Sequence, residues 1–411
     1  MARISPERLR ALIAEELPRA ISTRRDLHMH PEIAYEEHRT AEVIRRALQE
    51  AGIEFRGGLA GGTGTLAHLP GRGGHRATGH RATGHRATGL RADIDALPIA
   101  EEGDRAWKST IPGRMHACGH DGHTTILLTT ARVLARIAGE EGLPRGVSFL
   151  FQPAEEGGAG GRRMCEDGCL DGRVIGPPID RMYGLHGWPG WQCGMVGTRP
   201  GALFACSDRF EILVHGEGSH AAWPHFARDP IVAGSAIVTA LQTIISRNLD
   251  PLESGVISVT MFHAGSAMNV ISPLATLTGT ARALSDDTRD LIERRLGEVA
   301  RAIAEAHGCT ATATYTRGYP VTANNADEVV RFEQIALDSL GVARVLAFER
   351  PVMGGEDFSY YAQRVPACFF MLGLRPDDAA DMPSLHHPRF DFNDNALPTG
   401  VELFCRLAME E

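Results

Sequence analysis

The sequence predicts an α/β fold in which a helix-covered mixed central sheet, the α/β/α domain, is interrupted by a smaller inserted α+β domain. The first third of the chain alternates amphipathic helical segments with short apolar runs, as in a buried sheet covered by helices. From about residue 207 the pattern becomes β-α-β-β-α-β, the order of a ferredoxin-like unit. Helix–strand alternation then resumes. We therefore expect a discontinuous domain, 1–206 and 317–411, around an inserted domain at 207–316.

The first domain should begin with amphipathic helices near 6–28 and 36–51, followed by a third helix over 123–137. Buried strands are expected at four short apolar runs: TGTLAHL, ATGLRADI, GVSFLFQ and RMYGLHG. Functional sites gather at the carboxyl ends of strands in such sheets. The polar residues near the ends of these runs are therefore candidates: Asp93, Asp95, Glu155, Glu156 and His186.

The inserted domain should open with the strand DRFEILVHG, in which polar and apolar residues alternate. A helix follows at 229–248, with Asp229 as a suitable N-cap and Pro230 at the first helical position. Two strands, GVISVTMFH and ATLTGTARAL, precede a charged amphipathic helix over 286–307 that Gly308 closes. CTATATYT is the last expected strand.

Composition and charge exclude several classes of function. The 411 residues are 43% hydrophobic and 23% charged, which suits a globular protein of two domains. The net charge is −9 with both signs mixed along the chain, so nucleic acid, which needs a basic face, is not an expected partner. No apolar run approaches the ~20 residues that span a bilayer, and no secretion signal is evident. We expect a cytoplasmic protein that does not contact a membrane.

The eight cysteines are scattered without the spacing of a disulfide framework, so we expect them to be reduced. Cys165 and Cys169 could form a metal or disulfide pair. The favoured interpretation is two small residues on one helix, because no partner pair follows them.

The pentapeptide HRATG occurs three times in succession between residues 75 and 89. Its histidines, His75, His80 and His85, could bind a metal ion. An expanded surface loop is the favoured interpretation, because glycine punctuates the repeat and loop tips tolerate insertion.

Side chains of the types that bind metal ions are concentrated in four short segments. The residues are Cys118, His120 and His123 in MHACGHDGH, Glu155 and Glu156 in FQPAEEG, His186 in LHGW, and His386 and His387 in LHHP. Adjacent carboxylates repel each other unless a cation lies between them or one is protonated. Cys, His and Glu suit zinc-like or manganese-like ions, and a second carboxylate could act as a general base on metal-activated water. The sequence therefore predicts a metal-dependent hydrolase.

Spacing limits which of these side chains can share an ion. On an extended segment residues i and i+2 lie on one face, so Cys118 and His120 could share a metal. Neighbours point apart, so only one of Glu155 and Glu156 should face the metal, and only one histidine of LHHP should ligate. Residue types alone do not say which glutamate binds the metal and which acts as the general base. The alternatives are a buried cysteine beside a hydrogen-bonded histidine, and a solvated acidic pair at a helix N-terminus.

The chain resembles the M20 metallopeptidase family in seven motifs: RRDLHMHPE, LRADIDALPI, MHACGHDGHTT, FQPAEEG, GSHAAWPH, MGGEDFSYY and LHHPRFDFND. They are most similar to its amidohydrolase branch, which includes hippurate hydrolases, N-acyl-amino-acid deacylases and auxin-conjugate hydrolases. The resemblance runs from about Arg24 to the C-terminus. It implies a catalytic domain with two divalent metal ions, which could be Zn, Mn, Co or Ni. It also implies a satellite dimerisation domain that makes a homodimer or higher homo-oligomer.

Carried over residue by residue, the resemblance implies hydrolysis of N-acyl amino acids such as hippurate or N-acetyl amino acids. It assigns metal-ligand roles to five residues: Cys118, His120, Glu156, His186 and His386. It makes Glu155 the general base. It implies that His220 polarises the scissile carbonyl, often in a partner subunit, and that Asn269 contacts substrate. Without the resemblance, His220 would be interpreted as a turn histidine capped by Ser219.

The chain departs from the family pattern at Trp223, at the two cysteines of MCEDGC, and at Trp188 and Trp191 beside His186. These changes leave the ligand residues intact but bear on the choice of substrate. Three alternatives therefore stay open. They are a dipeptidase or aminopeptidase, a deaminating or other C–N hydrolase of aromatic amines, and a non-catalytic, metal-dependent ligand-binding protein.

Overall fold

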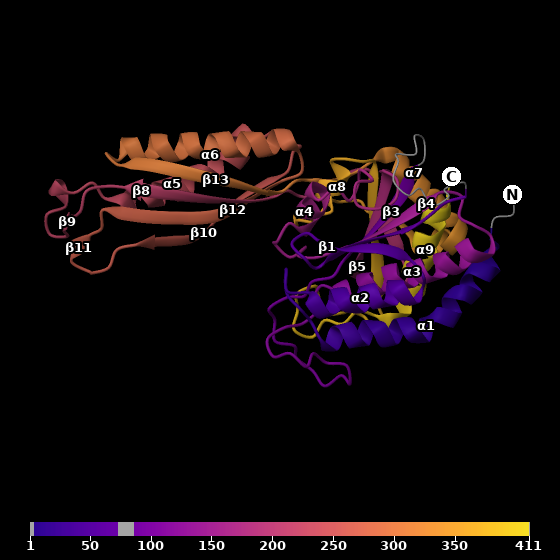
Figure 1. Ribbon diagram of the computed structural model, residues 1–411. Coiled ribbons are helices and arrows are strands. Elements are labelled where there is room, and N and C mark those ends of the chain that lie inside the picture. The colour runs from indigo at the N-terminus through magenta and orange to yellow at the C-terminus, as the bar shows by residue number, and fades with distance from the viewer. Residues whose placement is uncertain (1–3, 73–85, 411) are drawn as a thin grey trace. The chain divides into compact units, whose positions relative to one another are not determined.

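The structure is a computed structural model that describes residues 4–72 and 86–410, and its chain divides into two compact units (Figure 1). Unit 1 contains Met1–Gly201, Ala323–Glu349 and Asp357–Glu411. Unit 2 contains Ala202–Thr322 and the short segment Arg350–Glu356. The chain therefore leaves unit 1 for unit 2 and returns, with one further brief excursion before its last part.

Unit 1 is built on an eight-stranded sheet with the strand order β1-β2-β4-β3-β5-β16-β6-β15. Strands β4, β3, β5 and β16 run parallel to one another, whereas β1–β2, β2–β4 and β16–β6 are antiparallel pairs. The strand bounds are β1 Glu54–Leu59, β2 Gly64–Leu69, β3 Ala87–Asp93, β4 Gly146–Gln152, β5 Ile179–Gln192, β6 Val196–Thr198, β15 Val345–Ala347 and β16 Ala367–Arg375. The predicted mixed sheet is confirmed. Strand β1 was missed because it contains two glycines and is mostly exposed.

The first three helices of unit 1 pack together beside this sheet, and the helix His38–Glu50 contacts β1 and β2 directly. Helix α3 (His120–Glu140) packs against β2, β3, β4 and β5, and both α1 (Pro6–Met29) and α2 (His38–Glu50) pack on α3 (Figure 1). Helix α3 is therefore buried along most of its length. The remaining helices of unit 1 are α4 Gly160–Glu166, α7 Ala326–Leu340, α8 Ser359–Ala362 and α9 Leu397–Met409.

Unit 2 contains an antiparallel sheet with the order β10-β12-β8-β13, and its helices α5 and α6 pack on that sheet. The chain order β8, α5, β10, β12, α6, β13 is the predicted β-α-β-β-α-β sequence. The bounds are β8 Ser207–His215, α5 Pro230–Thr243, β10 Gly255–Ala264, β12 Leu274–Ala283, α6 Asp286–Ala306 and β13 Thr310–Tyr319. Asp229 caps α5 as expected, because its side chain accepts hydrogen bonds from Ile231 N and Val232 N. A two-stranded sheet pairs β9 (Ser219–His220) with β11 (Val270–Ile271).

Within the described residues, one helical stretch, Pro230–Asn248, is long and apolar enough to cross a membrane by length and composition alone. It comprises α5 and the short π-helix η2 (Ile244–Asn248) that follows it. Inspection of the sequence did not predict it, because polar residues interrupt the apolar run. One such helix is weak support for a membrane span, since core helices pass the same test.

The HRATG repeat precedes β3. Residues 75–85, which hold its first two copies and the three repeat histidines, lie outside the described residues. The last three residues of the third copy, Ala87 to Gly89, begin β3 and are buried. The expectation of a surface loop at this repeat therefore stays a prediction.

Candidate metal centre

Neighbouring parallel strands of unit 1 carry the acidic and histidine side chains of the candidate site. Strand β3 ends at Asp93, and Glu155 follows the end of β4. The sequence predicted His186 near the end of a strand. It lies inside β5 instead, because β5 continues to Gln192. The pairing of β3 with β5 nevertheless stops two residues before His186, at the pair Arg91↔Gly184. His186 therefore lies beyond the end of the β3–β5 ladder.

Cys118 and His120 lie at the N-terminus of α3. The expectation that they share one face of an extended segment was wrong. The residue between them, Gly119, is the N-cap of α3 and has a left-handed φ of 86°. A Cβ at Gly119 would lie 3.1 Å from the ring of Phe392, so both conformation and packing favour glycine there. The sequence predicted this helix from residue 123, and it begins three residues earlier because glycine lets the chain turn directly into it.

Glu155 and Glu156 also lie in a turn, so the expectation that an extended segment points them apart was wrong. Ala154 has a φ of 54°, and the N–H of Gly157 donates to the carbonyl oxygen of Glu155 at 2.7 Å. Both carboxylates belong to one group with His120. A non-glycine residue with positive φ is uncommon and is often found at functional sites.

Five ligand-type side chains form overlapping groups whose potential ligand atoms lie within 4.8 Å of one another. We call them the metal-ligand cluster: Cys118, His120, Glu156, His186 and His386. One group joins Cys118 to His120 and His186, and another joins Cys118 to Glu156 and His386. Cys118 belongs to both groups, so its sulfur connects the two halves of the cluster.

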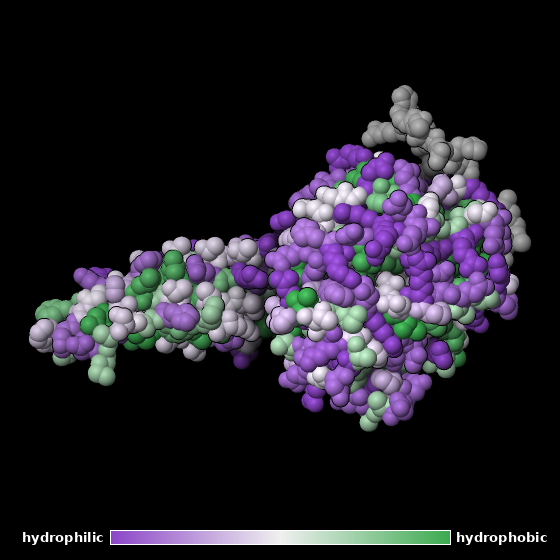
Figure 2. Space-filling view, turned by 60° about the horizontal axis from the view of Figure 1, so that its bottom comes forward, coloured by the Kyte–Doolittle hydropathy of each residue, from purple (hydrophilic) through white to green (hydrophobic). Residues whose placement is uncertain are grey.

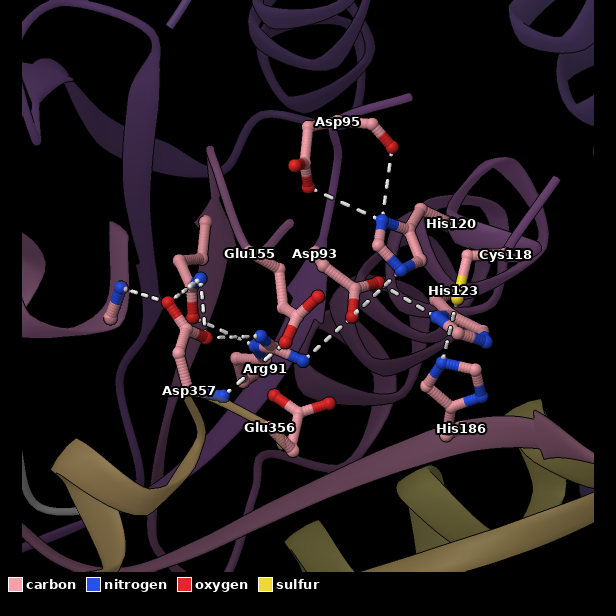
Figure 3. Close-up of polar contacts among 12 residues, drawn as sticks. Arg91, Asp93, Asp95, Cys118, His120, His123, Glu155, His186, Glu356 and Asp357 are labelled. Atoms are coloured by element: carbon pink, nitrogen blue, oxygen red, sulfur yellow. Dashed lines mark hydrogen bonds and ion pairs between the residues drawn. The ribbon is translucent and has the colours of Figure 1, made fainter. Parts of the chain in front are cut away.

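Two histidines of the cluster have their ring orientation fixed by hydrogen bonds at Nδ1, and Figure 3 shows those of His120. His120 Nδ1 donates to the carbonyl and carboxylate oxygens of Asp95, at 2.9 and 3.2 Å. His186 Nδ1 donates to the carbonyl oxygen of Gly187 at 2.8 Å, and its Nε2 lies 3.3 Å from Cys118 Sγ. Each ring therefore presents Nε2 to the cluster, which is the arrangement that orients metal-ligating histidines.

His123, in the same segment, uses both ring nitrogens in other contacts. Its Nδ1 donates to Asp93 Oδ1 at 2.7 Å, and its Nε2 accepts the N–H of Gly187 at 2.8 Å. A neutral imidazole has one donor and one acceptor, so no lone pair of His123 is left for an ion. His123 is thus a residue of a type that can bind metal, but its ring contacts give it a structural role.

Of the two histidines in LHHP, the structure places His386 against the cluster. His386 Nε2 lies 3.1 Å from Glu156 Oε1, and its backbone N–H donates to the carbonyl oxygen of Ala117 at 2.8 Å. Its φ of 64° is left-handed, so the chain turns sharply at this position. The ring of His387 instead accepts the backbone N–H of Arg389 at Nδ1, 3.1 Å away.

A fully buried ionic network supports the strand ends, and inspection of the sequence did not assign it. Arg91 Nη1 donates to Asp93 at 2.8 Å, and Arg91 Nη2 donates to Asp357 at 2.8 Å (Figure 3). Gln152 Nε2 also donates to Asp357, and the backbone N–H of Asp357 donates to Glu155 Oε1 at 3.3 Å. Arg91 and Asp357 occur in the motifs LRADIDALPI and MGGEDFSYY. The presence of these residues in family motifs was the feature of the sequence that could have pointed to the network.

The electrostatics of the site favour a cation. Although burial opposes a positive charge, the carboxylates of Asp93 and Asp95 raise the pKa of His120 to about 10. Burial and the charges of Glu156 and Glu155 raise the pKa of the Cys118 thiol well above its usual value. Without a metal ion, the carboxylates would thus hold a proton on His120, and burial together with the carboxylates would hold one on Cys118. Divalent ions would satisfy the same negative field and release those protons.

The donor set fits divalent metal ions. His120 Nε2 is buried and makes no hydrogen bond with any of residues 4–72 or 86–410; the nearby Asp93 Oδ2 is 3.6 Å away. An imidazole nitrogen in that position needs a partner, because an unpaired buried polar atom is costly. Imidazole, thiolate and carboxylate ligands suit zinc and neighbouring transition metals, so the cluster can hold such ions.

The two remaining residues assigned by resemblance lie in unit 2. His220 belongs to β9 and pairs with Val270 of β11, and the N–H of Ala221 donates to the carbonyl oxygen of Asn269 at 2.9 Å. Both side chains are exposed, and His220 Nδ1 accepts the N–H of Ala222 at 3.1 Å. The structure thus brings His220 and Asn269 together within unit 2, while Glu155 and the metal-ligand cluster come together within unit 1.

Comparison with known proteins identifies relatives along almost the whole chain. A sequence model described as peptidase family M20/M25/M40 matches residues 89–410. The chain is 39% identical over 390 residues to the protein YhaA of Bacillus subtilis (strain 168), covering 95% of this chain and 93% of that protein. It is 36% identical over 391 residues to the N-acetylcysteine deacetylase of the same organism, covering 95% and 96%. It is 36% identical over 394 residues to IAA-amino acid hydrolase ILR1-like 5 of Arabidopsis thaliana, covering 94% and 85%.

Among solved structures, the chain is similar to the YXEP protein of Bacillus subtilis, described as a dinuclear metal-binding peptidase of the M20 family. The TM-score is 0.81 with 32% sequence identity, and the match covers 96% of this chain and 98% of the other. Residues 89–410, which the family model matches, include every segment that contributes to the metal-ligand cluster.

Proposed function

The chain belongs to peptidase family M20/M25/M40 and is a metal-dependent amidohydrolase, and we propose that it hydrolyses the amide bond of N-acyl amino acids. The products would be a carboxylic acid and a free amino acid. The observation that carries the proposal is the position of Glu155, a buried carboxylate in one group with His120 and Glu156. A general base is needed beside a metal centre when water is the nucleophile.

The names of two relatives support this substrate class. One names the deacetylation of N-acetylcysteine, and the other names the hydrolysis of an IAA–amino acid. Both names describe removal of a group joined to an amino acid. The acyl group and the amino acid that this chain prefers follow from neither name, so the first experiment surveys both.

We assign two divalent ions to the metal-ligand cluster, with Zn, Mn, Co and Ni as candidates. When bound, they would lower the pKa of water and polarise the amide carbonyl. Asp95 holds two ligands in place, because its carboxylate accepts hydrogen bonds from both His120 Nδ1 and the backbone N–H of Glu156. This shared anchor fixes the distance between the two ligand segments.

Glu155 moves the proton in the proposed reaction. Its carboxylate takes a proton from the attacking water and later delivers it to the nitrogen of the leaving amino acid. The N–H of Asp357, 3.3 Å from Glu155 Oε1, helps to hold the carboxylate in position. His220 and Asn269 are proposed to bind the carbonyl oxygen and the substrate, respectively, which stabilises the oxyanion as the carbonyl is attacked.

The test is a mass-spectrometric survey of the metal-reconstituted enzyme against N-acetyl and N-benzoyl amino acids, unblocked dipeptides and aromatic amines. We expect cleavage of N-acyl amino acids to give equal amounts of acid and amino acid. Cleavage of unblocked dipeptides alone would instead identify a dipeptidase or aminopeptidase. Release of ammonia from aromatic amines would identify a deaminating enzyme, and either result would contradict the proposed substrate class.

We further propose that the protein forms a homodimer through unit 2. Strand β10 is an edge of its sheet, and several large apolar side chains on this strand and α5 are exposed: Ile231, Val232, Val256, Met261 and Phe262. Figure 2 shows hydrophobic residues on the visible surface of unit 2. Light scattering after gel filtration should give twice the 44.4 kDa chain mass, and Met261→Asp should give a monomer. A monomeric wild-type protein would contradict this proposal.

A further inference from the structure

A groove between α1 and α2 has a charge arrangement that the hydrolytic reaction does not use. The groove has a volume of about 270 Å³ and lies in unit 1. Its lining residues are Arg19, Ser22, Thr23, Asp26, Val43, Arg46, Ala47, Glu50 and Arg132. Both α1 and α2 pack on α3, and Arg132 reaches the groove from α3. This groove is slightly smaller than the ~300–1,000 Å³ of pockets for drug-sized ligands, so it suits a small one.

Arg132 is the unusual member of the lining. Its side chain is buried, with 8% of the residue exposed, and its Nε is buried without a hydrogen-bond partner. No carboxylate or other acceptor among residues 4–72 and 86–410 forms an ion pair or hydrogen bond with Arg132. A buried guanidinium without an anion is costly, and arginines at such positions are normally paired.

The acidic residues of the groove are already paired with other arginines. Glu50 accepts from Arg19, and Asp26 accepts from Arg39 at 2.9 Å. Exposed Arg46, like Arg132, has no ion-pair or hydrogen-bond partner in the described part of the chain. The groove therefore presents two guanidinium groups that form no ion pair or hydrogen bond with the described residues, one at the surface and one buried.

The local electrostatics oppose the bare charge of Arg132. Burial, and then the nearby positive charge of Arg19, lower the pKa of Arg132 from its ordinary value, and the carboxylates of Glu16 and Glu50 only partly oppose this effect. Arginine stays protonated in proteins, so this direction means that the charged side chain is disfavoured where it lies. A bound anion would reverse the imbalance.

We propose that this groove is a binding site for a small phosphate-class anion, which Arg132 and Arg46 hold with their guanidinium groups. The planar guanidinium matches the oxygens of phosphate in a bidentate manner, and the hydroxyl of Ser22 is a further donor on the lining. Arg132 comes 12 residues after His120 in α3, which is about 18 Å along the helix axis. The anion site is therefore separate from the metal-ligand cluster, although one helix carries residues of both.

Isothermal titration calorimetry of the metal-loaded protein with inorganic phosphate, at constant ionic strength set with sodium chloride, tests this inference. Arg132→Met removes the buried charge while keeping an unbranched apolar side chain. Arg136→Met is the matched control, because Arg136 lies one turn further along α3 and is already paired with Glu15 at 2.9 Å. Arg46→Met changes only an exposed side chain and keeps the test decisive if the Arg132 variant does not fold.

We expect the wild type and Arg136→Met to bind phosphate equally. Arg132→Met and Arg46→Met should each bind it about tenfold or more weakly, because a charge-assisted contact is lost. Phosphate at the metal centre would persist in all variants and appear as a second class of sites. Equal phosphate binding by the wild type and both groove variants would overturn the inference, as would no binding by the wild type.

Discussion

The carboxylate of Glu37 accepts a hydrogen bond from the backbone N–H of Ala154, at 2.9 Å, and so anchors the residue that precedes Glu155. Thr63 donates its hydroxyl to the other oxygen of Glu37 at 2.8 Å. Glu37 is completely buried and is 117 residues away from Ala154 in the chain. It therefore holds the left-handed turn that places Glu156 in the metal-ligand cluster and Glu155 beside it.

Stability should depend on pH through Glu37. Burial, followed by the charge of Asp95, raises the pKa of Glu37 from 4.5 to about 7. A raised carboxyl pKa means that the folded state binds the proton more tightly, so the free energy of unfolding falls as pH rises from about 4.5 to 7. In metal-free protein, Glu37→Gln should remove up to about 3 kcal/mol of this loss, measured by urea unfolding at several pH values. Glu36→Gln, an exposed neighbour, is the control. Parallel pH profiles for the wild type and Glu37→Gln would contradict this assignment.

Metal affinity should depend on Asp95, although Asp95 is not itself assigned as a ligand. Its carboxylate orients both His120 and Glu156, so Asp95→Ala frees two ligand segments at once. Loss of such a supporting contact typically weakens metal binding by about 10–100-fold. Competition with a chromogenic chelator measures the change. Asp180→Ala, at an aspartate paired with Arg145 away from the cluster, should leave affinity unchanged. Unchanged affinity in Asp95→Ala would argue against its anchoring role.

His120 and His123 should respond differently to substitution despite their shared motif. His120→Ala removes a proposed ligand and should lower the bound metal, measured by mass spectrometry after desalting. His123→Gln should keep the metal content, because both ring nitrogens of His123 already contact protein atoms. It should cost about 1–3 kcal/mol of stability, since a buried partner of Asp93 or Gly187 is left unsatisfied. Metal loss in His123→Gln with an intact fold would show that His123 is a ligand.

Two glycines of α3 form a matched pair for packing. A Cβ at Gly122 would lie 2.3 Å from the ring of Phe392, whereas nothing lies within 4 Å of a Cβ at Gly139. Gly122→Ala should destabilise the protein by about 1–3 kcal/mol through overpacking. Gly139→Ala should stabilise it by up to about 1 kcal/mol, because alanine is the better helix former. Thermal or urea unfolding measures both. Equal effects of the two substitutions would contradict the packing described at the start of α3.

The sequence predicted the parts of this fold that depend on local patterns. Short apolar runs located β2 to β5, and alternation with helical segments located the order of unit 2. It also supplied the types of ligand at the site. These features are encoded in neighbouring residues and in periodicity, so they can be read without the fold.

Features that depend on backbone turns and distant partners could not be predicted in this way. Alanine seldom adopts a left-handed conformation, so nothing local marked Ala154 as the turn that separates Glu155 from β4. Arg91 and Asp357 are 266 residues apart, and only the fold brings them into contact. Equally, the difference between His120 and His123 rests on which atoms occupy their ring nitrogens, and residue type does not reveal that.

We propose that Glu155 is the general base of this metal-dependent amidohydrolase, and the sharpest test is to measure both the kinetics and the metal content of Glu155→Gln. Glutamine keeps the shape of the side chain and one oxygen that can accept the N–H of Asp357, but it cannot take up the proton. We expect unchanged metal content and a loss of kcat of about 10²–10⁴-fold or more on the preferred N-acyl amino acid. Near-normal turnover with both metals bound would contradict it.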